Sequence, residues 1–317
     1  MAQLASLTLN TSGSLNLSNA TENTSSAGNV WYDTSTNQIK YSYQEFGAGA
    51  WSTGGALISS RDSHAGFGTQ NAALAAGGYY MGQLSTVEEY NGASWASGGS
   101  LIVGRMSFAG AGTQNAGLAF GGRDSSFSAV SCTEEYNGTS WSAGGALSTA
   151  REYLAGAGEQ NAALAFGGDS SCTEEYNGSS WSVGGALSTA RYAFAGAGTQ
   201  NAGLAFGGGF DPLLSCTEEY NGSSWSAGGA LITARFRLAG AGTQNAGLAF
   251  GGGDAYADLS CTEEYNGSSW SAGGALSNAR YKLAGAGTQN AGLAFGGCFN
   301  CLTEEYNKSS LIGICSL

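Results

Sequence analysis

One repeated stretch constrains the fold of this chain more than any other feature. The stretch at residues 239–252 reads AGAGTQNAGLAFGG, and near-copies of it end at Gly78, Gly122, Gly168, Gly208, Gly252 and Gly297. Each copy is followed by a loop of variable length, then by Glu-Glu-Tyr-Asn and usually by a Trp. A chain with this periodicity forms a closed ring or a stack of one supersecondary unit.

Each repeat opens with an arginine and contains four short segments with the pattern of β-strands. The arginines are spaced by 40 to 46 residues and are Arg61, Arg105, Arg151, Arg191, Arg235 and Arg280. In the repeat that opens at Arg191, we expect strand A at 194–198, strand B at 202–206, strand C at 216–220 and strand D at 224–226. The Asn221-Gly222 pair predicts the tight turn between strands C and D.

Four antiparallel strands in each period predict a β-propeller blade rather than one coil of a solenoid. The Ala and Gly content of strand A has a physical reason in that fold. The innermost strands crowd towards the propeller axis, so only small side chains fit there. Larger Leu, Phe, Tyr and Trp side chains then fill the wider space between the blades.

The composition excludes several functional classes. The 54 glycines lie at fixed positions between apolar residues, which indicates ordered repeats rather than disorder. The net charge of −12 argues against nucleic-acid binding, which needs clustered Lys and Arg. No apolar run approaches the roughly 18 residues of a membrane span. The start of the chain lacks the basic and apolar regions of a secretory signal, so we expect synthesis in a cytoplasm and no membrane insertion.

The Gly-Gly after strand B, the following Tyr and a Trp five residues later resemble the kelch repeat. The pairs Tyr136 and Trp141, Tyr176 and Trp181, and Tyr220 and Trp225 carry this resemblance. It covers residues 41–317 and implies a propeller in which each repeat forms one blade. The WD40 repeat matches less well, because its Gly-His start and Trp-Asp end are missing.

The predicted fold is therefore all-β: a kelch-like propeller at residues 41–317, preceded by a short N-terminal β arm at residues 1–40. The simplest closure gives six four-stranded blades. The last blade then takes three strands from residues 280–306 and its outer strand from residues 51–57, which protects both edges. The alternative is a seventh blade built from residues 4–57, with residues 311–317 as the last strand.

The N-terminal segment carries a second resemblance. Residues 28–41, GNVWYDTSTNQIKY, followed by Trp51, resemble a segment common in tail-fibre and other appendage proteins of bacteriophages. Residues 44–50, QEFGAGA, depart from the usual pattern. The resemblance implies localisation in the virion and attachment to other virion proteins through residues 1–40. A homo-oligomer is compatible with that role.

Residues that often carry catalysis have structural explanations here. His64 is the only histidine, and it aligns with Phe or Leu in the other repeats, which indicates a packing position. Neighbouring residues such as Glu88 and Glu89 point to opposite faces of a strand. We expect a structural Arg–Glu contact from the repeated pairs, with a calcium ring as the alternative. We therefore predict no catalytic residue, metal or cofactor. A disulfide among Cys298, Cys301 and Cys315 stays open.

The segments that differ between repeats are the best candidates for a binding site. All loops between strands B and C emerge on one face of a propeller, and variation on one face of a rigid frame is typical of a recognition surface. Neutral drift would also explain it. Residues after each arginine vary as well, as in Phe236-Arg237. The candidate ligand-binding residues are Tyr79, Tyr80, Arg123, Asp124, Phe127, Asp169, Phe210, Asp211, Asp254, Tyr256 and Asp258.

Three functions are compatible with these features. The sequence favours a virion appendage protein, a tail fibre or similar, that binds a host-surface receptor or glycan and has no enzymatic activity. The alternative is a structural decoration or adaptor within the virion. A glycan-cleaving enzyme is less favoured, because it would need carboxylates that converge from Asp169, Asp211, Asp254 and Asp258.

Overall fold

The computed structural model describes residues 18–19, 30–33, 38–209 and 212–316. Every regular element among these residues is a β-strand. The described part of the chain holds no helix that could cross a membrane. Residues 1–17, 20–29 and 34–37 of the expected N-terminal β arm lie outside the described residues.

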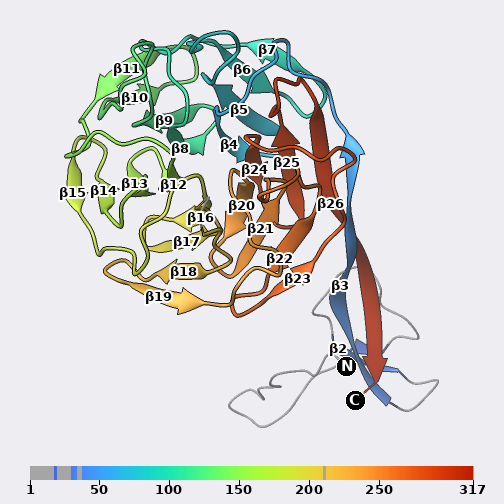
Figure 1. Cartoon of the computed structure of the whole chain (residues 1–317). Helices are drawn as coiled ribbons and strands as arrows, with labels where there is room; N and C mark the ends of the chain where they lie inside the picture. The colour runs from blue at the N-terminus through green and yellow to red at the C-terminus, as the bar shows by residue number, and fades with distance from the viewer. Residues whose placement is uncertain (1–17, 20–29, 34–37, 210–211, 317) are drawn as a thin grey trace. The chain divides into compact units, whose positions relative to one another are not determined.

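Six blades surround a central axis, each built on four antiparallel strands (Figure 1). Blade 1 contains β4 (Ala65–Thr69), β5 (Ala72–Ala76), β6 (Val87–Tyr90) and β7 (Trp95–Ser97). Blade 2 contains β8 (Ala109–Thr113), β9 (Ala116–Phe120), β10 (Thr133–Tyr136) and β11 (Trp141–Gly144). Blade 3 contains β12 (Leu154–Glu159), β13 (Ala162–Gly167), β14 (Thr173–Tyr176) and β15 (Trp181–Val183). Blade 4 contains β16 (Ala195–Thr199), β17 (Ala202–Phe206), β18 (Thr217–Tyr220) and β19 (Trp225–Gly228). Blade 5 contains β20 (Ala239–Thr243), β21 (Ala246–Phe250), β22 (Thr262–Tyr265) and β23 (Trp270–Ala272).

Blade 6 joins the two ends of the chain. Its strands are β24 (Ala284–Gly287), β25 (Ala291–Phe295), β26 (Thr303–Ser316) and β3 (Gln38–Thr53), and the sheet continues into β2 (Val30–Asp33) and β1 (Ser18–Asn19). The six-bladed fold is therefore confirmed, and the seven-bladed alternative is wrong because β3 completes the sixth sheet. The chain divides into two compact units, residues 1–48 with 308–317 and residues 49–307.

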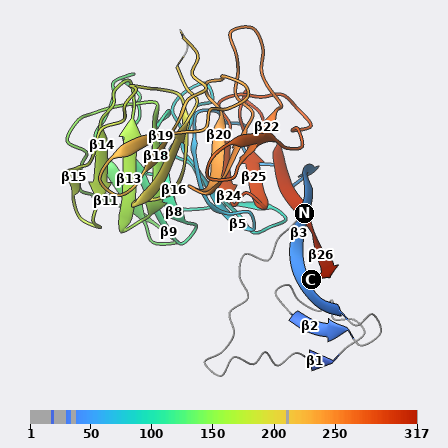
Figure 2. The same cartoon turned by 90° about the horizontal axis from the view of Figure 1, so that it is seen from below.

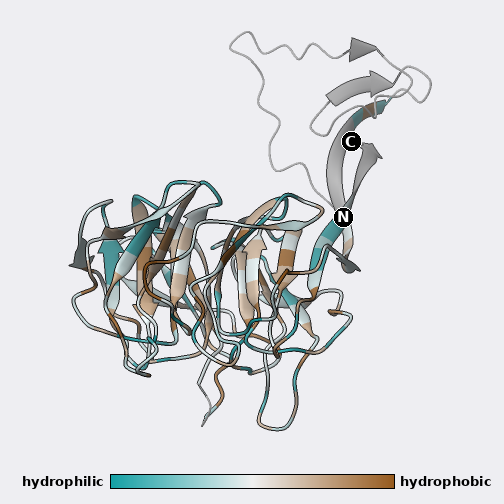
Figure 3. Cartoon of the chain, turned by 90° about the horizontal axis from the view of Figure 1, so that it is seen from above, coloured by the Kyte–Doolittle hydropathy of each residue, from teal (hydrophilic) through white to brown (hydrophobic). Residues whose placement is uncertain are grey.

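Small residues line the axis, as the sequence predicts. A Cβ atom on Gly66 of strand β4 would lie 2.5 Å from the ring of Phe295 in the preceding blade. A strand-B phenylalanine covers the equivalent glycine in the same way in four further blade interfaces. Brown, hydrophobic segments run along the strands that form the interior of the blades (Figure 3). The inner strands can therefore approach the axis while the larger rings fill the space between the blades.

Side-chain hydrogen bonds join each blade to the one before it. Tyr176 of blade 3 donates its hydroxyl proton to Glu135 of blade 2 at 2.5 Å, and the same Tyr–Glu contact recurs in all six interfaces. Burial, together with this hydrogen bond, raises the pKa of Tyr176 to about 12. Gln160 of blade 3 donates to the carbonyls of Gly117 and Tyr136, a contact that also recurs six times. The second glutamate of each pair thus serves the blade interface.

The first glutamate of each pair binds the arginine that opens the same repeat. Arg191 and Glu218 are almost fully buried and lie 2.6 Å apart, and Glu218 also accepts the backbone N–H of Ser188. All six repeats contain this ion pair. The expected structural Arg–Glu contact is confirmed, and it lies within each blade.

The wall of the axis holds the single histidine. His64 is 6% exposed, and its ring centroid lies 5.5 Å from that of Phe295. Burial, together with the nearby cations Arg61 and Arg280, holds the pKa of His64 well below its ordinary value. Phe108, Leu154, Phe194, Leu238 and Leu283 occupy the same position in the other blades and are also buried. The predicted packing role of His64 is confirmed.

The buried ion pairs give a first prediction. Glu218→Gln should lower the free energy of unfolding by roughly 3–5 kcal/mol, because it leaves Arg191 buried without a counter-charge. The matched control is Glu152→Gln, which removes the half-exposed ion pair between Glu152 and Arg123 and should cost at most about 1 kcal/mol. Urea unfolding of the two variants measures both values, and equal losses would contradict the account.

His64 gives a second prediction, on pH. In the unfolded chain His64 takes up a proton as the pH falls through about 6.5, whereas the folded protein resists protonation to a much lower pH. Falling pH therefore favours the unfolded state. His64→Leu should remove this loss, which amounts to at most about 1.4 kcal/mol for each pH unit below 6.5. Urea unfolding of both proteins at pH 7.5 and pH 5 checks it. Stability differences between variant and wild type that do not change with pH would refute it.

Candidate functional site

The loops between strands B and C lie beside the residues that follow the repeated arginines. Isolated β-bridges pair Asp62 with Tyr79, Met106 with Arg123, and Phe236 with Gly253. The orange loop between β21 and β22 rises from one face of the propeller in Figure 2. The predicted loops and the segments after the arginines therefore share one face, which we call the loop face.

The aromatic residues predicted for ligand binding are mostly accessible. Tyr80, Phe127 and Tyr256 are 44%, 56% and 96% exposed. Tyr79 is half-buried, and both Tyr79 and Tyr80 lie 6.3 Å from Phe299, measured between ring centroids. The blade 1 and blade 6 loops thus meet through these rings, while Tyr256 stands out from the blade 5 loop.

The predicted charged residues have several different surroundings. Asp124 and Asp254 each accept two backbone N–H bonds from their own loop, and these bonds lower the pKa of Asp254. Arg123 forms an ion pair with Glu152 at 2.5 Å. Asp258 accepts a hydrogen bond from the thiol of Cys298 at 3.3 Å. The structure therefore gives Asp124 and Asp254 a role in shaping their loops.

The remaining predicted residues are Asp169, Phe210 and Asp211. Asp169 is exposed at the start of the short loop of blade 3, with a φ of 57°. Phe210 and Asp211 lie outside the described residues. Cys298 and Cys301 are free thiols. No group of three or more His, Cys, Asp or Glu within the described ranges is placed to hold a metal ion.

A second site, outside the predicted set, lies on the propeller axis. It is built on the residue two positions after each repeated arginine. All six of these residues have φ between 52° and 58°, although none is glycine. Each donates its backbone N–H to the carbonyl of its counterpart in the preceding blade at 2.6 to 3.0 Å. The six residues that form this closed hydrogen-bonded ring, the axial ring, are Ser63, Ser107, Tyr153, Ala193, Arg237 and Lys282.

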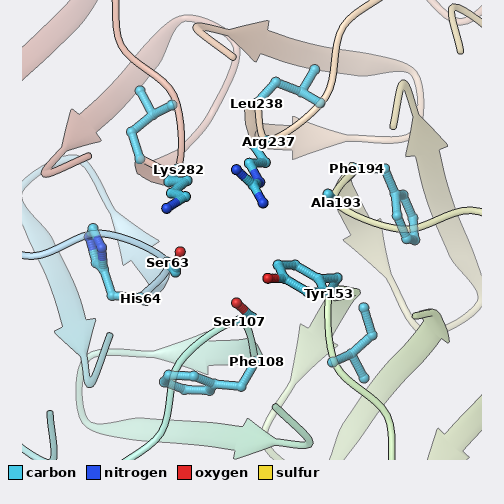
Figure 4. A pocket seen from close by; sticks show the side chains of 12 residues that line it. Ser63, His64, Ser107, Phe108, Tyr153, Ala193, Phe194, Arg237, Leu238 and Lys282 are labelled. Carbon is cyan, nitrogen blue, oxygen red and sulfur yellow. The ribbon is translucent and has the colours of Figure 1, made fainter. Parts of the chain in front are cut away.

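The axial ring encloses a cavity of about 130 Å³, which we call the axial pocket. In Figure 4 the hydroxyls of Ser63, Ser107 and Tyr153 and the cationic ends of Arg237 and Lys282 lie around its centre. The next residue of each blade, His64 and its Phe and Leu counterparts, forms the apolar wall. Beyond this wall the axis is lined by the Ala and Gly residues of the inner strands.

The two cations differ in their partners. Lys282 Nζ lies 3.5 Å from a carboxylate oxygen of Asp62, a side chain that is almost fully buried. Arg237 has no carboxylate partner among the residues that the structure describes; its guanidinium lies 5.3 to 5.9 Å from the ring centroids of Phe236, Tyr281 and Tyr153. These contacts fix the guanidinium in place without neutralising it.

The sequence contains only part of the signal for this site. The residues after the arginines vary between repeats while the frame around them does not. The spacing of the repeats, however, does not indicate that the residue two positions after each arginine faces a common axis. That information comes from the left-handed backbone conformation, which the sequence does not display because no glycine marks it.

A scan against protein-family models and a search of the curated proteins found no match to this chain.

Proposed function

We propose that this chain is a non-enzymatic binding module of a bacteriophage virion appendage, a tail fibre or similar, and that its propeller recognises a glycan or protein on the host surface. The resemblance of residues 28–41 to phage appendage segments supports the virion context. The resemblance of the blades to kelch repeats supports a propeller whose loops carry the function. Residues 1–40 attach the chain to other virion proteins in this proposal.

One observation carries the binding role. The backbone of the axial ring is the same in all six blades, yet five different residue types occupy it: Ser, Tyr, Ala, Arg and Lys. The loops on the same face differ in length and expose Tyr80, Phe127 and Tyr256. A rigid frame that holds varied side chains on one face suits recognition, because binding loses little free energy to ordering the site.

A structural adaptor within the virion is the second candidate. Asp124 and Asp254 favour it, since their carboxylates stabilise their own loops rather than facing outward as unpaired acids. A structural role would need these loops only as spacers or contacts to neighbouring subunits.

Binding of the full chain to bacterial cells and their purified surface polysaccharides tests the proposal. The key variant replaces residues 123–131 and 253–260 by Asp-Ser-Ser, the short loop that closes blade 3 at residues 169–171. We expect it to stay folded and to bind at least about tenfold more weakly, because it loses the variable part of the loop face. Ser223→Ala, in a turn between strands C and D, serves as the matched control and should bind as the wild type does.

Two results would contradict the proposal. A folded wild-type chain that binds neither the cells nor their polysaccharides would contradict recognition and favour the adaptor role. Shortening of the polysaccharide during incubation would show catalysis instead of binding alone.

A further inference from the structure

We propose that the axial pocket binds a single oxyanion, the carboxylate or phosphate group of an acidic saccharide. The oxyanion site follows from the pocket itself. The assignment of this oxyanion to a saccharide rests on the proposed function, in which the loop face recognises a glycan.

The strained backbone of the axial ring favours a binding role for its side chains. A non-glycine residue in the left-handed region is strained, whereas glycine adopts it freely. The chain has 54 glycines, and several stand at positive φ in the same blades, as at Gly77 and Gly78. None of the six ring positions uses one. A ring that only closed the axis would be more stable with glycine, so the side chains of the ring serve something besides closure.

The chemistry of these side chains matches an oxyanion. Two cations and three hydroxyl groups line the pocket (Figure 4). Ser107 is 8% exposed, and its hydroxyl has no hydrogen-bond partner within the described structure. A buried hydroxyl without a hydrogen-bond partner destabilises the protein. A ligand that accepts a hydrogen bond from it would remove this cost and bind more tightly. Arg237 offers a planar set of N–H donors that suits carboxylate and phosphate oxygens.

The charge balance of the pocket favours one anionic group. Asp62 offsets part of the charge of Lys282, whereas Arg237 keeps its charge. Glu152, next to Tyr153, is paired with Arg123. The local excess is therefore about one positive charge, in a chain whose formal net charge is −12. Elsewhere such a chain repels anions, so binding of an oxyanion would depend on this pocket.

The size of the pocket and its rim favour a saccharide over a peptide. A cavity of about 130 Å³ holds roughly four water molecules at their liquid volume, which suits one small polar group and not a chain. Tyr153 lines the pocket, and the half-buried rings of Tyr192 and Tyr281 lie next to Tyr153 and Arg237, so aromatic side chains stand beside the pocket. An extended peptide is usually held by free backbone groups, and the ring N–H groups already bind carbonyls of the preceding blade.

The experiment measures the affinity of the full chain for four probes by isothermal titration calorimetry. The probes are inorganic phosphate, a glucuronate-containing oligosaccharide, a neutral glucose oligosaccharide of equal length, and a glutamate-rich peptide. We expect phosphate and the acidic oligosaccharide to bind, the acidic one most tightly. Arg237→Gln and Lys282→Gln should each weaken both by about tenfold, and Ser107→Ala by a few-fold. Lys308→Gln removes a cation outside the pocket and should change the affinities by less than about twofold.

Each other outcome overturns a defined part of the proposal. If neither anion binds, or if Arg237→Gln leaves both affinities unchanged in a variant that unfolds like the wild type, the oxyanion site is wrong. If the peptide binds more tightly than the acidic oligosaccharide, or if phosphate alone binds, the assignment to a saccharide is wrong. Equal binding of acidic and neutral oligosaccharides would overturn the inference but leave the proposed glycan-binding function intact.

Discussion

The buried arginine that opens each repeat holds together the part of the blade on which the axial pocket depends. In blade 5 the guanidinium of Arg235 binds Glu263 and the backbone carbonyls of Gly251 and Cys261. Its own carbonyl accepts the N–H of Gly208 from the preceding blade. Two residues later, Arg237 enters the axial ring. Arg235 thus holds the strands of its own blade through its side chain and contacts the previous blade through its backbone carbonyl, two residues before the turn that faces the axis.

Closure of the propeller makes these contacts mutually dependent. The Tyr–Glu, Gln–carbonyl and backbone ring contacts each recur around all six interfaces, so each blade is held from both sides. Blade 6 belongs to this circle although its outer strand, β3, is far from β26 in the sequence. Such a frame tolerates different side chains at the axial ring, because the backbone contacts that hold the ring do not involve them.

Much of the frame could be predicted from the sequence, because the residues that build it recur at the same positions of the six repeats. Three features follow from strand geometry and from comparison between repeats: the small strand-A residues, the opposite roles of Glu88 and Glu89, and the packing of His64. One compensation was visible only in the structure. Blade 1 has Ala76 where other blades have Phe, and Phe67 from its inner strand covers Gly110 instead. The axial pocket was not predictable, because it combines one residue from each of six turns.

The central claim is that the axial side chains bind the oxyanion of the ligand and that the frame is equivalent at all six positions. The most direct test moves the unpaired cation by one blade, in the double variant Ala193→Arg, Arg237→Ala, and measures its dissociation constant for the glucuronate-containing oligosaccharide. The account predicts that the relocated guanidinium still reaches the pocket and restores most of the affinity that Arg237→Ala alone removes. An affinity as weak as that of Arg237→Ala alone, in a double variant that is folded, would contradict it.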